Sequence, residues 1–578
     1  MAAEPACRLV RPGPVAVPVP QLDADQQAVV DHLGGPLLVL AGPGTGKTTT
    51  LVEAMVERIE QRGARPDQVL ALTFSRKAAD QLRNRVTARL GRTTSATMAA
   101  TFHSFAYGLV RKYAPAELYD APLRLLSAAE QDVMLQDLLT GEFAVSWPPE
   151  LVRAVGTRGF AREVQSVLSR AREKGLDPVD LVVLAREQEE PALAAAGLFM
   201  QRYLDVLDWT GSVDYPDLIR RAVAFAEANR ADLRAAYTCV FVDEYQDTDP
   251  SQVALLQALA GDGRNLVVVG DPHQSIYAFR GAEVRGILDF PQTFRTASGQ
   301  RAPVQVLGAT RRFGPVLLRA AQQVAARLPL TGSIPPAERA KFLSPTSVTD
   351  SAGRVDVATF DTDRAEVEHI ADHLRRAHLH DGVDWSEMAV LVRSGRASIP
   401  GLRRALGAAG VPVEVAADDT PLVREPALAP LLAALRAVIA PDHLTADQAR
   451  ALLLSPLGGL DATELRQLAR ALRARDAVAS AAQVGHRQNS AELLRQAVVS
   501  PDRLADLSAH PDSAAPGSST PWQAADRVVA KAVRLQELIA SAANVLESGG
   551  SVEEVLWALW SQTAWPSRLR SAALGGGP

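Results

Sequence analysis

A glycine-rich segment near the N-terminus has the residue types and spacing of a phosphate site. The segment reads Ala41-Gly42-Pro43-Gly44-Thr45-Gly46-Lys47-Thr48-Thr49. Glycines let backbone N–H groups turn toward an anion, and the start of a helix adds the positive end of its dipole. Lys47 is placed to reach the β- and γ-phosphates of a nucleotide, and the Thr48 hydroxyl to hold Mg²⁺. Residues 41–49 therefore predict a nucleotide-phosphate site.

One position departs from the strict form of this pattern, because Ala41 stands where a glycine is usual, and only the relaxed form is met. The competing interpretation is a glycine-rich turn between strand and helix without a ligand. A second feature favours the phosphate site: the apolar run Cys239-Val240-Phe241-Val242 ends in Asp243 and Glu244. Asp243 would bind Mg²⁺, directly or through water, and Glu244 would orient or deprotonate the attacking water.

Short apolar runs separated by helical stretches must position these groups. The runs expected to be strands are 37–40, 69–74, 240–242 and 266–269, and the α/β pattern returns at 304–307, 354–357 and 388–392. Strands that alternate with helices indicate a parallel sheet covered on both faces. Residues 109–205 and the stretch after about 440 look helical. The fold class expected is α/β, with two parallel-sheet units that are each interrupted or followed by helices.

Composition excludes several other classes of protein. At roughly 150 residues per domain, 578 residues suggest about four domains, and 47% hydrophobic with 22% charged residues is ordinary for a globular protein. Cys7 and Cys239 are too few for a disulfide framework, an iron–sulfur cluster or a cysteine-rich zinc site, and they fit a cytoplasmic location. No apolar run is long enough to span a membrane. The net charge of −5 restricts any nucleic-acid contact to a local groove or patch.

Five ordered segments resemble one family closely. They lie at 22–26, 72–79, 101–105, 243–249 and 269–282, the last reading VGDPHQSIYAFRGA. Together they resemble the UvrD/Rep/PcrA group of superfamily 1 DNA helicases from about residue 21 to about 440. Within that group the wording is most similar to the actinobacterial AdnA/AdnB-type helicase–nuclease subunits. The resemblance implies two RecA-like domains, ATP and Mg²⁺ as cofactors, and 3′→5′ unwinding of DNA in repair and recombination.

The resemblance also implies roles for residues around the nucleotide. Gln26 would read the adenine edge, because its amide is both donor and acceptor. Gln274 would sense the γ-phosphate and link hydrolysis to the DNA site. Arg312 would reach the γ-phosphate from the second α/β domain as an arginine finger. Arg311 replaces the aromatic residue that stacks on adenine in the family, and a guanidinium can stack on a base as well.

A further set of residues is implied to contact single-stranded DNA. Tyr277 and Phe279 would stack on bases, a contact worth about 1–3 kcal/mol per base and indifferent to sequence. Phe74, Thr101, His103 and Arg280 would lie along the same track. Blander alternatives are open: Phe74 and Phe279 could pack in the core, His103 could be a capping or buried histidine, and the basic helix from Arg76 to Arg89 could be a solvated face.

The resemblance implies the following division of the chain, after a disordered lead-in at 1–20. The first RecA-like domain comprises 21–108 and 206–298 and is interrupted by a helical insertion at 109–205. The second RecA-like domain comprises 299–438 and is followed by a helical insertion at 439–578. Two motifs that complete the second domain in the family do not follow residue 440. A C-terminally truncated chain with an incomplete second domain is therefore expected.

Two alternatives to an active helicase follow: a fragment that binds ATP and DNA without processive turnover, or a subunit completed by a partner chain, as in a helicase–nuclease heterodimer. A P-loop metabolic kinase is a more distant alternative.

Overall fold

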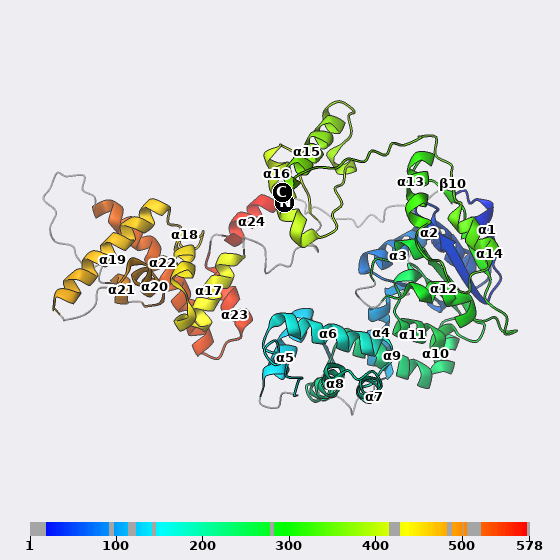
Figure 1. Ribbon diagram of the computed structural model, residues 1–578, viewed down its shortest axis with the longest axis horizontal. Helices are drawn as coiled ribbons and strands as arrows, with labels where there is room; N and C mark the ends of the chain where they lie inside the picture. The colour runs from blue at the N-terminus through cyan, green and yellow to red at the C-terminus, as the bar shows by residue number, and fades with distance from the viewer. Residues whose placement is uncertain are drawn as a thin grey trace, which may run out of the picture. The chain divides into compact units, whose positions relative to one another are not determined.

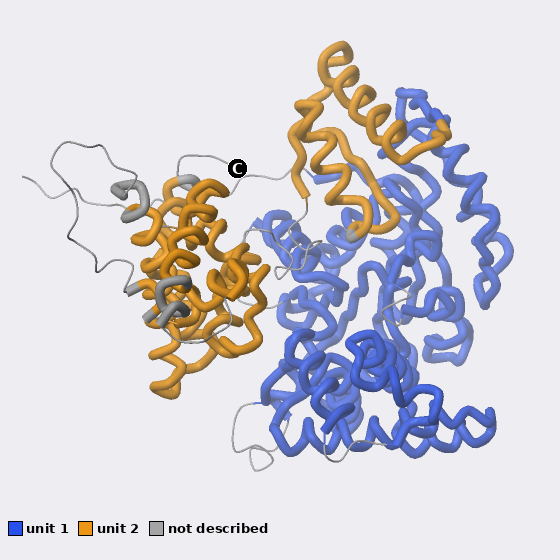
Figure 2. The backbone as a smooth tube through the Cα atoms, turned by 60° about the vertical axis from the view of Figure 1, so that its left-hand side comes forward, with its two compact units in different colours: residues 1–357 blue, residues 358–578 orange. Residues whose placement is uncertain are grey.

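The computed structural model describes residues 19–91, 98–113, 123–141, 146–277, 282–415, 428–482, 488–500, 502–505, 522–563 and 565–574. The chain divides into two compact units, residues 1–357 and residues 358–578. Figure 1 shows the secondary structure, and Figure 2 colours the two units. The first unit contains the central sheet and all the expected site residues that fall within the described ranges.

Six parallel strands form the sheet of the first unit, in the order β3-β2-β6-β7-β1-β8. Their bounds are β1 (Pro36–Ala41), β2 (Val69–Thr73), β3 (Ala99–Thr101), β6 (Cys239–Val242), β7 (Asn265–Gly270) and β8 (Val304–Leu307). β7 pairs with β1 on one side and with β6 on the other. Because the strands are parallel, the glycine-rich segment after β1 and the acid pair after β6 emerge at the same end of the sheet. The predicted parallel α/β fold is confirmed.

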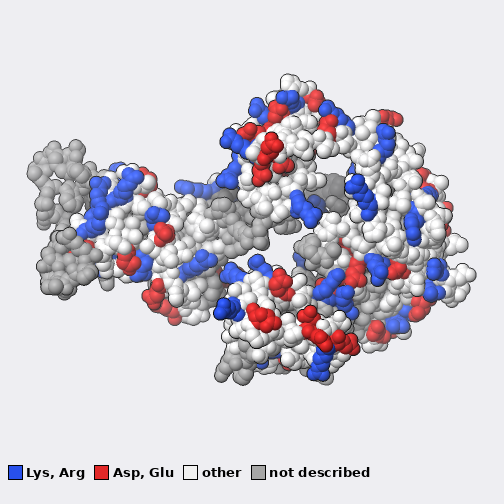
Figure 3. All heavy atoms as spheres, in the orientation of Figure 1, with Lys and Arg blue, Asp and Glu red and all other residues white. Residues whose placement is uncertain are grey.

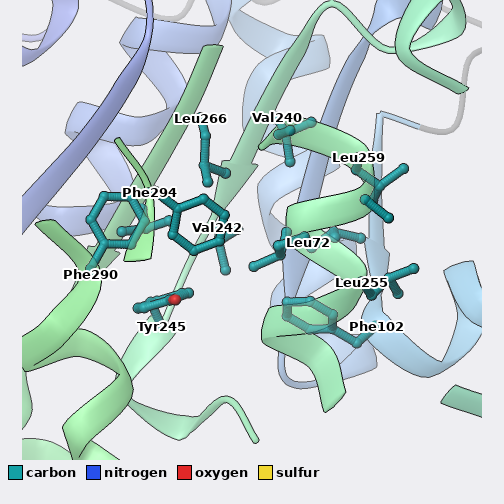
Figure 4. Close-up of a cluster of buried hydrophobic side chains, with 14 of the residues drawn as sticks. Leu72, Phe102, Val240, Val242, Tyr245, Leu255, Leu259, Leu266, Phe290 and Phe294 are labelled. Atoms are coloured by element: carbon teal, nitrogen blue, oxygen red, sulfur yellow. The ribbon is translucent and has the colours of Figure 1, made fainter. Parts of the chain in front are cut away.

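Helices cover both faces of this sheet. Alternate strand residues point to opposite faces, so that Leu37 and Val39 pack on one side and Leu38 and Leu40 on the other. One face is covered by α1 (Ala24–Asp31), α2 (Lys47–Glu60) and α3 (Arg76–Leu90). The other is covered by α4 (Phe102–Tyr113), α9 (Tyr215–Ala228), α10 (Arg230–Ala236), α11 (Pro250–Ala260) and α12 (Val284–Thr293). Figure 4 shows the second core, where the Tyr245 and Phe290 rings meet edge to face.

The described residues 128–141 and 146–209 form a helical insertion with its own core. Its helices are α5 (Ala128–Thr140), α6 (Arg158–Glu173), α7 (Pro178–Glu187) and α8 (Pro191–Trp209). Two short strands, β4 (Arg124–Leu125) and β5 (Ser212–Val213), pair in parallel where the insertion leaves and rejoins the sheet domain. A buried Arg172–Asp214 ion pair of 2.7 Å, to which the Tyr203 hydroxyl also donates, fixes α6 and α8 to the residue before α9.

The three later apolar runs behave differently from one another. Val304–Leu307 forms β8, but it pairs with β1 in the first sheet rather than starting a second one. The short strands β9 (Ala309–Thr310) and β10 (Thr346–Ser347) pair with each other, next to α13 (Pro315–Ala325) and α14 (Pro336–Leu343). The expected strands at 354–357 and 388–392 are wrong, because these residues form no strand in the structure. A strand needs a neighbouring edge with which to exchange hydrogen bonds, and among the described residues neither run has one.

The second unit is helical. Its helices are α15 (Asp363–Leu379), α16 (Gly395–Ala408), α17 (Ala429–Ile439), α18 (Ala446–Leu454), α19 (Ala462–Ala482), α20 (Ser490–Val499), α21 (Asp502–Ala505), α22 (Trp522–Glu547), α23 (Val552–Ser561) and α24 (Trp565–Leu574). A large apolar core joins α17 to α23, whereas α15 and α16 share only a small one. None of the described helices is long and apolar enough to cross a membrane. On the face drawn in Figure 3, Lys and Arg side chains are interspersed with Asp and Glu.

Candidate nucleotide site

The glycine-rich segment forms a tight loop between β1 and α2. Gly44 and Gly46 have φ angles of +78° and +89°, a left-handed conformation that side chains strongly disfavour. Gly46 is the N-cap of α2, so Lys47 and Thr48 occupy the first turn of the helix. The two glycines therefore allow the chain to turn from a buried strand into a helix without strain.

The carbonyl groups of the loop are all held by hydrogen bonds. The donors come from three different parts of the first unit: Thr45 Oγ1 to Gly42 O (2.8 Å), Thr310 Oγ1 to Pro43 O (2.8 Å), Arg311 N to Gly44 O (2.9 Å), Gln26 Nε2 to Thr45 O (3.0 Å) and Thr50 N to Gly46 O (2.9 Å). In contrast, the amides of Gly44, Gly46, Lys47 and Thr48 donate no hydrogen bond within the described chain. Unpaired amides beside a helix N-terminus form a ready anion site.

The acid pair at the end of β6 lies beside this loop. The Nζ atom of Lys47 is 3.3 Å from Oε2 of Glu244, so the lysine of the loop and the expected catalytic base are in contact. Glu244 has a φ of +52°, unusual for a residue other than glycine. Such backbone strain is typical of functional positions. The structure thus brings together two residues that are separated by nearly 200 positions in the sequence.

Asp243 is only 8% exposed, and its environment disfavours a charge. Burial raises the pKa of its carboxyl group to about 6, helped by the neighbouring Glu244 and opposed by Lys47. A bound cation would restore the charged form. Mg²⁺ is typically held by one or two protein oxygens together with substrate phosphates. Asp243 and the Thr48 hydroxyl are a suitable set, and no cluster of three or more His, Cys, Asp or Glu side chains in the described chain offers another metal site.

Gln246 connects the ends of two strands; it belongs to the segment 243–249 that carries the resemblance, but the sequence analysis gave it no role. It lies in a 3₁₀ turn, η3 (Tyr245–Asp247), where its Nε2 donates to Glu244 Oε2 (2.8 Å) and its Oε1 accepts from the amide of Asp271 (2.9 Å). Asp271 in turn accepts a 2.6 Å hydrogen bond from Nε2 of Gln274. A side chain at Gly270 would collide with Gln246, since its Cβ would be 2.6 Å from Oε1. A polar chain thus runs from Glu244 to Gln274.

The residues expected to contact the adenine base and the γ-phosphate of the nucleotide also border the loop. The amide of Gln26 is engaged at both ends, with Oε1 accepting from Asp23 N (3.0 Å) and Nε2 donating to Thr45 O. Arg311 forms a 2.8 Å ion pair with Asp23. Arg312 lies next to the loop, because a Cβ on Gly44 would be 2.4 Å from its Cβ. Adenine recognition by Gln26, base stacking by Arg311 and phosphate contact by Arg312 stay predictions.

The expected DNA-contacting residues are brought together only in part. Phe74, directly after β2, and Tyr277, which follows β7, have ring centroids 4.5 Å apart. Phe74 is half-buried and its ring lies against that of Tyr277, and a contact of Phe74 with DNA stays a prediction. Thr101 accepts a hydrogen bond from the Ser104 amide, 3.1 Å away, at the start of α4. Phe279 and Arg280 lie outside the described residues.

The surroundings of His103 fit a buried, packed histidine at least as well as a DNA contact. Its ring meets the Tyr215 ring edge to face, with centroids 4.9 Å apart. Burial lowers the pKa of the imidazole, and the nearby Asp249 carboxylate opposes this only in part. A neutral, half-buried histidine packed on a tyrosine needs no ligand to explain it.

Comparison with known proteins agrees with this geometry. Residues 22–295, which span the loop, the acid pair and the polar chain, match the UvrD/REP helicase N-terminal domain. Residues 22–295 are therefore similar to the N-terminal domain of UvrD-type helicases. The chain is 30% identical to ATP-dependent DNA helicase UvrD1 of Mycobacterium tuberculosis over 427 residues, 70% of this chain and 51% of that protein. It is 26% identical to ATP-dependent DNA helicase PcrA of Staphylococcus epidermidis over 383 residues, 66% of this chain and 49% of that protein.

The matched range ends at residue 295, within the first unit. UvrD2 of Mycobacterium tuberculosis, also an ATP-dependent DNA helicase by name, is 32% identical over 298 residues, 48% of this chain. The chain spans about half the length of the UvrD1 and PcrA relatives that it matches.

Proposed function

We propose that this chain hydrolyses ATP with Mg²⁺ and uses the energy to move along single-stranded DNA and unwind duplex DNA. One observation carries the proposal: unpaired loop amides, the Lys47–Glu244 contact and the buried Asp243 meet at the end of one sheet. That set supplies what phosphoryl transfer to water needs, namely phosphate binding, a metal ligand and a base. The names of the UvrD-type relatives agree with ATP and DNA as the ligands.

The contacts suggest how the site works. When nucleotide phosphates enter the loop, Lys47 exchanges Glu244 for the phosphate oxygens, and the freed carboxylate can accept a proton from the attacking water. Mg²⁺, held by Thr48 and Asp243, would neutralise charge on the phosphates. The hydrogen bond from Gln246 keeps Glu244 oriented while Lys47 leaves.

A path from hydrolysis to DNA follows the polar chain. Gln246 and Gln274 are joined through Asp271, and Tyr277 lies three residues beyond Gln274. The Tyr277 ring contacts Phe74, so a displacement of Gln274 would change the position of this aromatic pair. Movement along DNA requires that the two nucleotide states differ in DNA affinity, and this connection can provide the difference.

The direction and setting of the activity are also part of the proposal. The resemblance of the five ordered segments supports 3′→5′ polarity and a role in DNA repair and recombination. An AdnA/AdnB-type placement, a truncated parent chain and completion by a second helicase–nuclease subunit are finer predictions that rest on the same resemblance. A cytoplasmic location is proposed on the low cysteine content.

The test is ATP turnover with and without a single-stranded oligonucleotide, in the wild type and in Glu244→Gln. Glu244→Gln should lower turnover about 100-fold or more while ATP binding persists, because the amide fills the same space but cannot take a proton. Glu57→Gln, a half-buried position in the last turn of α2 that pairs with Arg62, is the matched control and should behave like the wild type. Unchanged turnover in Glu244→Gln would contradict the assigned base.

DNA stimulation separates the proposal from its main alternative. Strong stimulation by the oligonucleotide supports a motor, and partial duplexes with a 3′ or a 5′ single-stranded tail then test polarity. Binding of ATP and DNA without stimulated turnover favours the alternative of a chain that binds both ligands passively.

A further inference from the structure

The segment Thr310–Arg312 lies directly against the phosphate loop, and its contacts are made by atoms with no assigned role. The hydroxyl of Thr310 donates to Pro43 O at 2.8 Å, and the backbone amide of Arg311 donates to Gly44 O at 2.9 Å. Thr310 is only 1% exposed, so its hydroxyl has no bulk water as an alternative partner. Losing this bond would deprive the half-buried Pro43 carbonyl and the buried Thr310 hydroxyl of a partner.

Residues 308 and 311 are held by the N-terminal end of α1, through its N-cap Asp23 and through Asp25. The amide of Gly308 donates to Asp25 Oδ2 at 3.2 Å, and Lys341 pairs with the other oxygen of that carboxylate. Arg311 pairs with Asp23 at 2.8 Å. In addition, β9 pairs with β10 in register, Thr310 opposite Ser347. Thr310 therefore donates from a braced segment and not from a free loop.

The close approach of Thr310 and Arg312 to the loop also explains why residue 44 is a glycine. A Cβ at Gly44 would be 2.5 Å from Thr310 Oγ1 and 2.4 Å from the Cβ of Arg312. No side chain fits there, so Gly44 is required both by its φ of +78° and by the segment packed on it. The peptide groups on either side of Gly44 are thereby held with their carbonyl oxygens toward residues 310 and 311.

A peptide group that points its carbonyl one way points its N–H the other way. Because Thr310 Oγ1 and Arg311 N hold the carbonyls of Pro43 and Gly44, the amides of Gly44 and Thr45 are turned away from that segment. The Gly44 amide is among those with no partner in the described chain. Resting on the proposed nucleotide site, we infer that Thr310 is a positioning residue, whose hydroxyl holds the loop with the Gly44 amide free for a phosphate oxygen.

Removal of the hydroxyl alone tests the inference. Thr310→Val keeps the shape and the β-branch but loses the donor, so the loop carbonyl is released and the KM for ATP should rise about fivefold, with a smaller change in kcat. Thr310→Ser keeps the hydroxyl and should retain the wild-type KM. Thr346→Val, on the neighbouring strand β10 and more exposed, is the matched control and should also retain it.

The outcomes separate positioning from a purely structural role. If Thr310→Val unfolds, Thr310→Ala, which adds no methyl group against the loop, is measured instead. A raised KM in the Val or Ala variant together with a normal KM in the Ser variant supports the inference. A wild-type KM in both, or an equal rise in Ser, overturns it. Lys47→Ala distinguishes failure of the proposed function: if turnover survives that change, the nucleotide site itself is wrong, whereas loss of turnover there with normal Thr310→Val kinetics rejects only the Thr310 inference.

Discussion

Leu38 in β1 and Leu391 in the run 388–392 sit in similar stretches of Leu and Val but have opposite surroundings. Leu38 is 0% exposed, and β1 has β7 on one side and β8 on the other. Leu391 is 94% exposed, and residues 388–392 form no strand. The run 388–392 instead borders an open pocket of about 890 Å³ together with residues 411–415 and side chains of α15 and α16. An apolar run has a propensity to form a β-strand, but it becomes part of a sheet only where neighbouring strands pair with it.

The difference matters for function because the phosphate loop depends on the finished sheet. The loop follows β1, the acid pair follows β6, and the strand between them, β7, carries Asp271 at its end. Three parallel strands in register thus place the reacting groups. Residues 354–357 and 388–392 lack such support within the described chain, and no expected site residue lies there.

Amide hydrogen exchange should show the largest contrast between the two regions. The amides of Leu266 to Val269 in β7 are bonded on a central strand and should open only with major unfolding. The amides of residues 388–392 should exchange about 1000-fold faster or more. The measurement is exchange into the full chain, followed by proteolysis and mass spectrometry of the peptides that contain each region. Equal protection in both regions would break the comparison.

A matched pair of substitutions should give the next largest effect. Leu38→Ala removes a fully buried side chain and should lower the free energy of unfolding by about 2–5 kcal/mol. Leu391→Ala removes an exposed one and should change it by less than about 0.5 kcal/mol. Denaturant unfolding of both variants checks this. A cost above 2 kcal/mol for Leu391→Ala would mean that the run 388–392 is buried in solution.

An aromatic pair extends the comparison to DNA. Phe74→Ala removes the ring that lies tilted against Tyr277 and should weaken single-stranded DNA binding about 10-fold, whatever the base sequence. Phe360→Ala, a partly exposed aromatic residue of the second unit, is the control and should leave binding unchanged. Fluorescence anisotropy with a labelled oligonucleotide measures both. Unaltered affinity in Phe74→Ala would return Phe74 to a packing role.

A smaller effect is expected at the junction of α6 with the sheet domain. Burial, together with the nearby Asp249 and against Arg170 and Arg172, raises the pKa of Glu173 from 4.5 to about 7. A raised pKa stabilises the fold below about pH 4.5, and that stability is lost as the pH rises through 7. Glu173→Gln should therefore be more stable than the wild type by about 1 kcal/mol at pH 8, allowing for solvent screening, and equal to it at pH 4. A pH-independent difference would contradict the shift.

The sequence was sufficient for the parts of the site that are local. The loop 41–49 and the run ending in Asp243 and Glu244 each carry their chemistry within a few residues, and the parallel sheet follows from the order of strands and helices. Thr310 and Gln246 could not be found this way. Thr310 meets Pro43 across 267 residues; Arg311 and Arg312 beside it were expected at the nucleotide, but no pattern assigned a contact to Thr310 itself.

The prediction of strands at 354–357 and 388–392 was wrong because it also depended on contacts with residues distant in sequence. Their composition is that of a strand, but strand formation depends on partners that a local pattern does not specify. Val304–Leu307 had the same pattern and found a partner in β1, on the edge of the first sheet.

ATP binding by Lys47→Ala tests the account most directly, because the phosphate site is the claim on which the others rest. Calorimetric titration with ATP and Mg²⁺ should show binding in the wild type and an affinity about 100-fold weaker in Lys47→Ala, since a charge contact to the phosphates is lost in a largely desolvated site. Lys174→Ala, which removes a surface contact with Glu283, should bind like the wild type. Equal ATP affinity in Lys47→Ala and the wild type would contradict the account.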